Sequence, residues 1–233
     1  SDLVGAPSTK DRRANRENKR EGTIVMKVLM VNGSPRKHGN TSRALDEMKS
    51  IFVQEGVETD EVRVGSADIR GCVSCFKCAE RGSCIFSDLV NKTAPKLEEA
   101  DGLVVGVPVY YGNMNATAMA FLQRLFYSTN RIDKTMKVGA GFAVARRGGT
   151  SATWDEINKY FAISGMPIAS GQYWSGVFGR EEGEAARDAE GLQQVRTLAR
   201  NMTFLMKSVA LGKASFGRSE EHTSELQSRS AIS

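Results

Sequence analysis

Residues 26–42 read MKVLMVNGSPRKHGNTS, and this stretch decides the fold. The apolar run 28–31 stops at the turn-forming residues NGSP (32–35), and a helical pattern opens at NTS (40–42). A buried strand, a tight hydroxyl-rich loop and a helix N-terminus together form a cradle for phosphate, because free backbone N–H groups and the positive end of the helix dipole face the loop. Ligand binding is therefore the first hypothesis for this chain.

The composition of the chain limits its class. Of its 233 residues, 40% are hydrophobic and 25% are charged, which suits one globular domain. No apolar run approaches the roughly 20 residues that span a bilayer, and the polar start lacks the apolar segment of a signal peptide. We therefore expect a cytoplasmic protein with no membrane partner. The net charge of +5 is mild and scattered, which argues against a nucleic-acid partner.

Both ends of the chain lack apolar periodicity. Residues 1–25 are mostly polar and charged, so we expect a disordered N-terminal extension. Residues 217–233 contain almost no apolar side chains, and we expect a disordered tail that is not native to the protein. The folded domain is predicted over residues 26–216.

Within that domain, apolar runs alternate with helical patterns. We expect strands at residues 26–32, 60–64, 102–107, 137–145 and 167–173. We expect helices at about residues 41–55, 88–99, 115–128, 150–164 and 185–212. Strands that alternate with crossover helices predict an α/β fold, in which a parallel sheet carries helices on both faces.

The loop that ends in NTS (40–42) offers groups for a phosphate monoester. It lacks the Gly-Lys-Ser/Thr ending of a P-loop and the G-x-G-x-x-G pattern of dinucleotide-binding folds. Hydroxyl groups come from Ser34, Thr41 and Ser42, and a guanidinium fork comes from Arg36. Asn40 is placed to act as the helix N-cap. An ordinary capped turn after a strand is the alternative interpretation.

Two further loops follow predicted strands, and ligands in open α/β sheets bind at the carboxyl ends of strands. PVYYGNM (108–114) combines a stiff proline, two flat aromatic side chains and a glycine that permits close approach. ARRGGT (145–150) exposes backbone amides beside arginines, which could stabilise negative charge on an electron-rich ring. A surface turn and a glycine-rich connector are the respective alternatives.

The three segments occur in the order and spacing of the flavodoxin-like NAD(P)H-dependent FMN reductases, and the chain resembles their iron–sulfur flavoprotein and multimeric-flavodoxin branch. The resemblance runs from residue 26 to about residue 216. It implies a flavodoxin-like three-layer α/β/α sandwich with a five-stranded parallel sheet of order 2-1-3-4-5, and FMN at the point where the strand order reverses. It also implies a homo-oligomer, either a dimer or a tetramer.

The resemblance also assigns the surroundings of the flavin. The residues that would hold the flavin phosphate are Ser34, Arg36, Asn40, Thr41 and Ser42. The residues that would line the isoalloxazine ring are Pro108, Val109, Tyr110, Tyr111, Gly112 and Asn113. The pyrimidine edge of the ring would be approached by Gly148 and Gly149.

All four cysteines fall in one segment with the spacing Cys72-x2-Cys75-x2-Cys78-x5-Cys84. In a cytoplasmic protein such clustering favours a metal site or redox chemistry over a disulfide framework. The compact spacing suits a 4Fe-4S cluster and matches that of the iron–sulfur flavoproteins. Zinc could use the same four thiolates, although its ligands usually come as two separated pairs. A loop that holds no cluster and shapes a subunit contact is the third interpretation.

The leading hypothesis is an FMN-dependent oxidoreductase that takes hydride from NAD(P)H and passes electrons to a quinone, a flavin or an iron–sulfur acceptor. The flavin carries this chemistry, so no catalytic side chain is predicted. The main alternative is a non-catalytic flavodoxin-type electron carrier for protein partners, although such carriers are usually acidic and this chain is mildly basic. A phosphate-ligand-binding regulator without redox activity is a third hypothesis.

Overall fold

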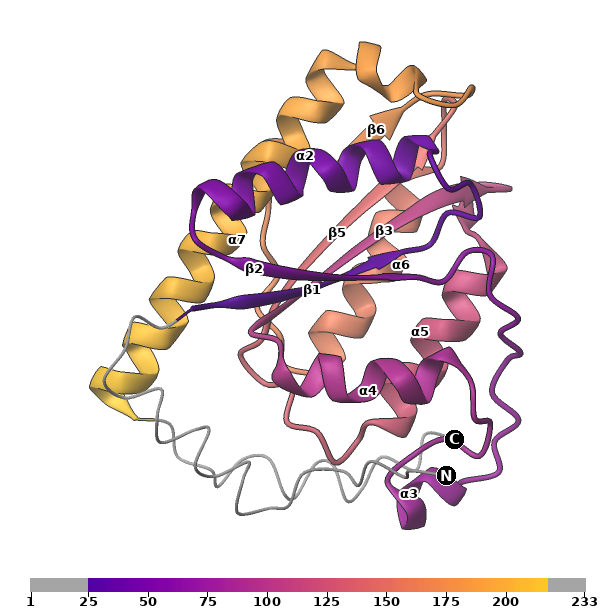
Figure 1. Ribbon diagram of the computed structural model, residues 1–233, viewed down its shortest axis with the longest axis vertical. Helices are drawn as coiled ribbons and strands as arrows, with labels where there is room; N and C mark the ends of the chain where they lie inside the picture. The colour runs from indigo at the N-terminus through magenta and orange to yellow at the C-terminus, as the bar shows by residue number, and fades with distance from the viewer. Residues whose placement is uncertain (1–24, 218–233) are drawn as a thin grey trace, which may run out of the picture.

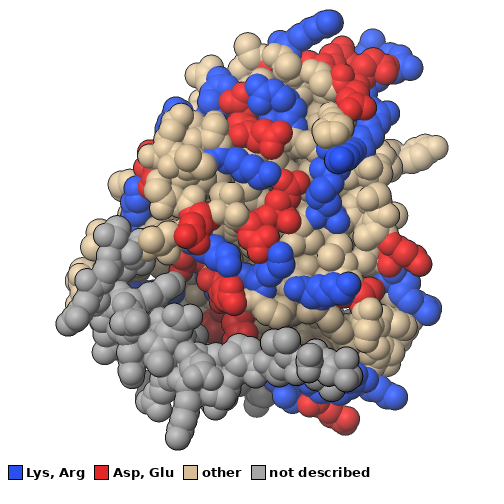
Figure 2. All heavy atoms as spheres, viewed as in Figure 1, with Lys and Arg blue, Asp and Glu red and all other residues tan. Residues whose placement is uncertain are grey.

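The computed structural model describes residues 25–217 as one sheet between two layers of helices (Figure 1). The two tails predicted to be disordered, 1–25 and 217–233, lie outside the described residues except for Val25 and Gly217. Within residues 25–217, no helix is both long and apolar enough to cross a membrane. On the face that Figure 2 shows, basic and acidic side chains are interspersed.

The sheet confirms the expected flavodoxin-like order. Its parallel strands lie in the order β2 (Glu58–Arg63), β1 (Lys27–Asn32), β3 (Gly102–Tyr110), β5 (Val138–Ala145) and β6 (Gly176–Phe178). A sixth strand, β4 (Asn113–Met114), is short and pairs antiparallel with the end of β3. Counted along the chain, the five parallel strands have the order 2-1-3-4-5; β4 was not expected, and the fifth parallel strand lies at other residues than predicted.

Helices cover both faces of the sheet, so the molecule has three layers (Figure 1). One face carries α2 (Asn40–Gln54) and α7 (Ala189–Phe216), and the short 3₁₀ helix η2 (Glu184–Arg187) precedes α7. The opposite face carries α4 (Leu89–Glu99), α5 (Ala116–Ser128) and α6 (Thr150–Ile163). The short helix α3 (Lys77–Arg81) lies at the bottom of Figure 1, whereas the carboxyl ends of β3 and β5 lie near the top.

Strand β1 explains why this sheet needs two helical layers. Val28 and Met30 pack into the core beneath α2 and α7, whereas Leu29 and Val31 pack into the core beneath α4 and α5. All four side chains are at most 1% exposed. A parallel strand that is buried on both faces shows a continuous apolar run, and residues 28–31 have that pattern.

The predicted strand at residues 167–173 is wrong. Only Ile168 forms an isolated bridge there, with Gly139 of β5, and the fifth parallel strand lies later, at Gly176–Phe178. The carbonyl of Pro167 accepts from the N–H of Gly139 at 2.8 Å, but Pro167 has no N–H of its own with which to extend the ladder. The intervening chain leaves the sheet and exposes Tyr173 and Trp174, whose rings contact each other in a tilted arrangement with centroids 4.7 Å apart.

Candidate functional site

The loop between β1 and α2 is held by Asn32, the last residue of β1. Its side chain is fully buried, and Oδ1 accepts a hydrogen bond of 3.1 Å from the backbone N–H of Ser34. Nδ2 donates to Ser42 Oγ at 3.1 Å and to Glu61 Oε1 at 2.9 Å. Asn32 therefore joins the start of the loop, the first turn of α2 and strand β2.

The N-terminus of α2 is left open. Its N-cap is Gly39, which provides no side-chain hydrogen bond, and its first turn contains no acidic residue. The expectation that Asn40 caps the helix is wrong, because its amide donates to the carbonyl of Glu181 at 2.9 Å and accepts from the N–H of Ala185 at 3.0 Å. An uncapped helix N-terminus presents backbone N–H groups and the positive end of the dipole to an anion.

Two arginines connect this loop to other segments of the chain. Arg63 of β2 donates to the carbonyl oxygens of Arg36 and Lys37, each at 2.9 Å, and to Ser42 Oγ at 3.2 Å. The guanidinium of Arg36 is exposed and donates to the carbonyl of Arg180 at 2.8 Å. The loop carbonyls are thus occupied by Arg63, while the cationic side chain of Arg36 stays at the surface of the loop.

Gly65, just after β2, lies against the same loop. A Cβ atom at this position would lie 2.1 Å from the backbone carbon of Ser34 and 2.3 Å from the carbonyl oxygen of Gly33. Only glycine permits this approach of two backbone segments.

The segment predicted as a loop at residues 108–114 is a β-hairpin. Pro108, Val109 and Tyr110 continue strand β3, and Asn113 begins β4. Tyr111 and Gly112 form the turn with φ angles of 52° and 78°, which is the pattern of a type I′ hairpin turn. Tyr111 is fully exposed and Tyr110 is about half exposed, so both rings are available to a ligand.

The third loop approaches this hairpin closely at Gly149. A Cβ atom on Gly149 would lie 2.7 Å from the Cα of Gly112 and 2.7 Å from Cγ1 of Val109. Gly149 has a φ of +92° and precedes the first residue of α6. Gly148 has no atom within 4 Å of the corresponding position, so its face is open.

Asn115 connects the hairpin to the first loop. Its Nδ2 donates to the carbonyl oxygen of Gly33 at 3.0 Å in a buried contact that spans 82 residues of sequence. Its Oδ1 is buried without a hydrogen-bond partner among the described residues. The structure therefore brings the three loops together at one end of the sheet. We call this set, residues 33–39, 108–114 and 146–149, the carboxyl edge.

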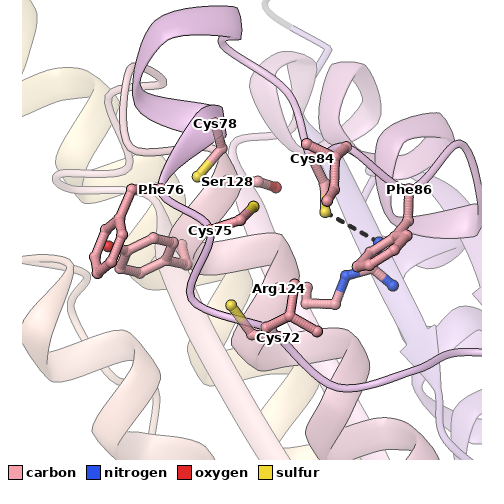
Figure 3. A pocket seen from close by; sticks show the side chains of 11 residues that line it. Cys72, Cys75, Phe76, Cys78, Cys84, Phe86, Arg124 and Ser128 are labelled. Carbon is pink, nitrogen blue, oxygen red and sulfur yellow. Dashed lines mark hydrogen bonds between the residues drawn. The ribbon is translucent and has the colours of Figure 1, made fainter.

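The four cysteines do not lie at the carboxyl edge. All are free thiols; Cys72 and Cys75 are exposed, Cys78 is buried and Cys84 is partly buried. They line one pocket, together with Arg124 and Ser128 of α5, and Figure 3 shows their sulfur atoms facing a common space. We call it the cysteine pocket. Among residues 25–217, no three His, Cys, Asp or Glu side chains are grouped so that they could hold a metal ion.

Side chains from α4 and α5 position the Cys84 end of this pocket. Asn91 Oδ1 accepts from the N–H of Cys84 at 3.0 Å, and Nδ2 donates to the carbonyls of Cys84 and Phe86 at 2.8 and 3.0 Å. Arg124 Nη2 donates to Cys84 Sγ at 3.1 Å. The Cys72–Cys78 end is backbone-shaped instead, because Ser74 and Phe76 adopt positive φ angles of 49° and 57°.

The electrostatics of the pocket differ between its groups. Burial raises the pKa of the Cys78 thiol, and the charges of the other three cysteines raise it further against the lowering effect of a backbone hydrogen bond. Burial lowers the pKa of the Arg124 guanidinium, but hydrogen bonds and charges from Asp88 and Cys84 raise it by more. Arg124 therefore remains a cation beside the sulfur atoms.

The sequence predicted the loops and the cysteines but not the residues that support them. Arg63, Gly65 and Asn115 make contacts that no local pattern encodes. Arg124 did leave a signal, because it lies within the apolar stripe of α5 beside Leu125. A charged residue at a core position of an amphipathic helix indicates a buried partner.

Comparison with known proteins places this geometry in a family. An iron–sulfur flavoprotein of Methanocaldococcus jannaschii is 29% identical over 195 residues, which cover 79% of this chain and 99% of that protein. An iron–sulfur flavoprotein of Methanosarcina thermophila is 28% identical over 187 residues, covering 79% and 97% of the two chains. The structure of RosB with bound 8-demethyl-8-formylriboflavin-5′-phosphate superposes with a TM-score of 0.65 and 18% identity, covering 88% of this chain and 84% of that chain.

The family model of the NADPH-dependent FMN reductases matches residues 26–179, which is more than half of the chain. The matched region includes β1 with its loop, the β3–β4 hairpin, the Gly149 loop and all four cysteines. The chain belongs to the NADPH-dependent FMN reductase family of flavin-dependent oxidoreductases.

Proposed function

We propose that this protein binds FMN at the carboxyl edge, takes hydride from NAD(P)H and passes electrons to an acceptor, the first of which is a 4Fe-4S cluster held in the cysteine pocket. The observation that carries the proposal is the convergence of the three loops at an uncapped N-terminus of α2. FMN, when bound, supplies hydride and single-electron transfer.

The residues at the α2 end fit the phosphate group of FMN. The hydroxyls of Ser34 and Thr41 lie near the first turn, and Arg36 supplies a surface cation. The hydroxyl of Ser42 already donates to the carbonyl of Lys37 at 3.1 Å and accepts from Asn32 and Arg63, so Ser42 would contribute its backbone N–H. Because the amide side chain of Asn40 is already hydrogen-bonded to residues 181–185, it would contribute its backbone N–H instead.

The hairpin and the third loop fit the ring of FMN. Pro108, Val109 and Asn113 hold the hairpin, and the exposed rings of Tyr110 and Tyr111 would cover the isoalloxazine and exclude water from it. The open face of Gly148 and the backbone of Gly149 would approach the pyrimidine edge. Backbone N–H groups there can stabilise negative charge on a reduced ring.

The donor chemistry of the cysteine pocket fits a thiolate-ligated group, although no three of the thiols, as they stand in this structure, are grouped to hold a single metal ion. Its four sulfur atoms belong to one short segment and line one space, and thiolates are the ligands of 4Fe-4S clusters. A cluster, when bound, supplies one-electron transfer. Helix α5 starts beside the hairpin at Asn115 and reaches the pocket with Arg124, about 14 Å further along its axis at 1.5 Å per residue.

The first experiment is the absorbance spectrum, with iron, sulfide and zinc contents, of the anaerobically purified protein. Flavin bands together with a broader visible absorbance and about four irons per chain support the proposal. Flavin bands with zinc or with no metal would refute the cluster and leave the flavin. A colourless protein that takes up no FMN would refute the flavin site as well. Steady-state oxidation of NAD(P)H with a quinone then separates an oxidoreductase from an electron carrier, which would show almost none.

Arg36→Ala tests the loop assignment. We expect FMN affinity, measured by titration of the flavin-free protein, to fall about tenfold, which corresponds to about 1.4 kcal/mol. Lys37→Ala is the matched control, because it removes the same charge from the neighbouring exposed position. An unchanged affinity in Arg36→Ala, or an equal loss in both variants, would contradict a specific contact by the Arg36 fork.

A further inference from the structure

Arg124 is a buried cation in the middle of an apolar helix face. Its side chain is 1% exposed and is among the largest fully buried side chains of the described residues. Its neighbours on α5 include the buried apolar side chains of Phe121 and Leu125. A guanidinium tolerates such burial only when charge and hydrogen bonds compensate it.

The partners of Arg124 hold its guanidinium in one orientation. Nη1 and Nη2 donate to the two carboxylate oxygens of Asp88 at 2.6 and 3.1 Å, in the paired geometry that favours arginine over lysine. Nη1 also donates to the carbonyl of Arg70 at 3.3 Å, and the ring of Phe86 lies 4.9 Å from the guanidinium carbon. These contacts fix the guanidinium without any contribution from the cysteines.

The fixed guanidinium then contacts a sulfur atom. Nη2 donates to Cys84 Sγ at 3.1 Å. Figure 3 draws this hydrogen bond as a dashed line beside the Phe86 ring. Arg124 lines the pocket, and its Nε is buried without a hydrogen-bond acceptor among the described residues. A charged N–H donor beside a sulfur is matched best by a thiolate, because charge-assisted hydrogen bonds are the stronger ones.

We propose that Arg124 is a positioning residue for the group bound by the cysteines: it holds Cys84 in the orientation of a ligand and raises the reduction potential of that group. The inference rests on the proposed 4Fe-4S cluster. Reduction adds one electron, supplied by reduced flavin in the proposed function, and so adds one negative charge beside the guanidinium. Arg124 stabilises the more negative form, and no bond or proton of the chain changes.

Hydrogen bonds to cluster sulfurs and nearby charge are established determinants of cluster potentials. Arg124 is the cation whose hydrogen bond to a cysteine sulfur the structure records. Asp88 does not cancel its effect, because Asp88 contacts the guanidinium and the N-terminus of α4, where it accepts from the N–H of Val90 at 3.0 Å. The sulfur therefore has a cationic N–H as its direct hydrogen-bond donor, and the carboxylate is linked to the sulfur through the guanidinium.

The test is a mediated potentiometric titration of the anaerobically purified holoprotein, followed by electron paramagnetic resonance for the cluster and by absorbance for the flavin. In Arg124→Gln, which keeps hydrogen-bonding groups but loses the charge, we expect the oxidised-to-reduced ratio of the cluster at a given potential to rise at least tenfold. That is a shift of about 59 mV to lower potential for one electron. The flavin potential is expected to stay unchanged.

Two further variants make the test decisive. Arg131→Gln removes an exposed cation that donates to the carbonyls of Ala79 and Glu80 rather than to a sulfur, and it is expected to shift the cluster potential less than Arg124→Gln and to leave the flavin potential unchanged. Arg124→Lys keeps the charge without the fork and is expected to retain more of the wild-type potential than Arg124→Gln. If Arg124→Gln binds FMN but holds no iron, the positioning role is supported and the lysine variant decides the effect on potential.

Two outcomes would overturn the inference, and they are distinguishable from failure of the proposed function. Wild-type cluster potential and full iron content in Arg124→Gln would show that Arg124 only stabilises the fold. An equal shift of the flavin and cluster potentials would show a general disturbance. A wild-type protein without a cluster, by contrast, would refute the proposed cofactor before any variant is measured.

Discussion

The carboxyl edge and the cysteine pocket occupy two ends of helix α5, and they are positioned by different parts of the chain. At the carboxyl edge, backbone approaches backbone at Gly65 and Gly149, and the loops continue directly from strands of the sheet. In the cysteine pocket, Asn91 and Arg124 reach from two helices to a segment with little regular structure. The carboxyl edge therefore requires glycines, whereas the cysteine pocket requires long polar side chains.

This contrast has a functional consequence. A flavin is large and planar and needs a surface of backbone amides with little side-chain bulk, which strand ends and glycines provide. A cluster needs four thiolates around a compact group, and their orientation is set by surrounding hydrogen bonds. A substitution in one region can therefore weaken binding there and leave binding in the other region unchanged.

The largest effect is expected from Gly65→Ala. The added Cβ would overlap the backbone of Ser34 and Gly33, which cannot move without displacing the first loop. We expect a loss of about 1–3 kcal/mol in the free energy of unfolding and an FMN affinity at least about tenfold weaker. Thermal denaturation and flavin titration measure the two quantities.

The matched control for this variant is Gly71→Ala. Gly71 belongs to the same irregular segment, but no atom lies within 4 Å of its added Cβ. Its free energy of unfolding is expected to stay within about 0.5 kcal/mol of the wild type. If Gly65→Ala bound FMN as tightly as Gly71→Ala does, the first loop would not depend on the backbone contact.

An effect confined to the other region, and smaller in total because FMN affinity is spared, is expected from Asn91→Ala. It removes the three hydrogen bonds that hold Cys84 and Phe86. We expect a loss of about 1–3 kcal/mol of stability and lower iron retention, while FMN affinity remains that of the wild type. Iron content after gel filtration and flavin titration provide the comparison.

Asn91→Asp refines this prediction. The aspartate keeps an acceptor for the N–H of Cys84 but loses the donors to the two carbonyls, so iron retention is expected to lie between those of the wild type and Asn91→Ala. A parallel loss of FMN and iron in either variant would contradict the separation of the two regions.

The sequence predicted the fold well because its signals are local. The apolar run 28–31 and the periodic helices predicted a parallel sheet with helices on both faces, and the family resemblance implied the order of its strands. The fifth strand was misplaced because Gly176–Phe178 is short and lies at the edge of the sheet, where β5 is its one partner strand among the described residues. The apolar residues around Ile168 gave a stronger pattern than the strand itself.

The site was predictable only in part, for a related reason. Loops that follow strands could be expected to meet, and Gly149 and Gly112 do lie against each other. The braces Arg63 and Asn115 could not be expected, because their contacts join segments 26 and 82 residues apart. The proposed contacts of these loops with FMN stay predictions until a flavin titration is made.

The smallest effect concerns Glu61, which links β2 to the carboxyl edge through Asn32. Burial raises the pKa of Glu61, but hydrogen bonds from Lys49 and Asn32 and the charges of Lys49 and Arg63 lower it by more, so its net pKa lies below the ordinary value. A carboxyl group whose pKa is lower in the folded state contributes stability above the unfolded pKa, about 4.3, and loses it as pH falls through the folded pKa.

We therefore expect Glu61→Gln to be less stable than the wild type by up to about 1 kcal/mol at neutral pH, since the glutamine keeps an acceptor for Asn32 but loses the ion pair with Lys49. Urea denaturation between neutral pH and about pH 3 should show this difference shrinking below pH 4.3, with Glu58→Gln as a control for removing a carboxylate from the same strand. A difference that persists in acid would mean that shape and hydrogen bonding, not charge, couple β2 to the loop. The carboxyl edge would then depend on backbone packing alone, in sharper contrast to the charged cysteine pocket.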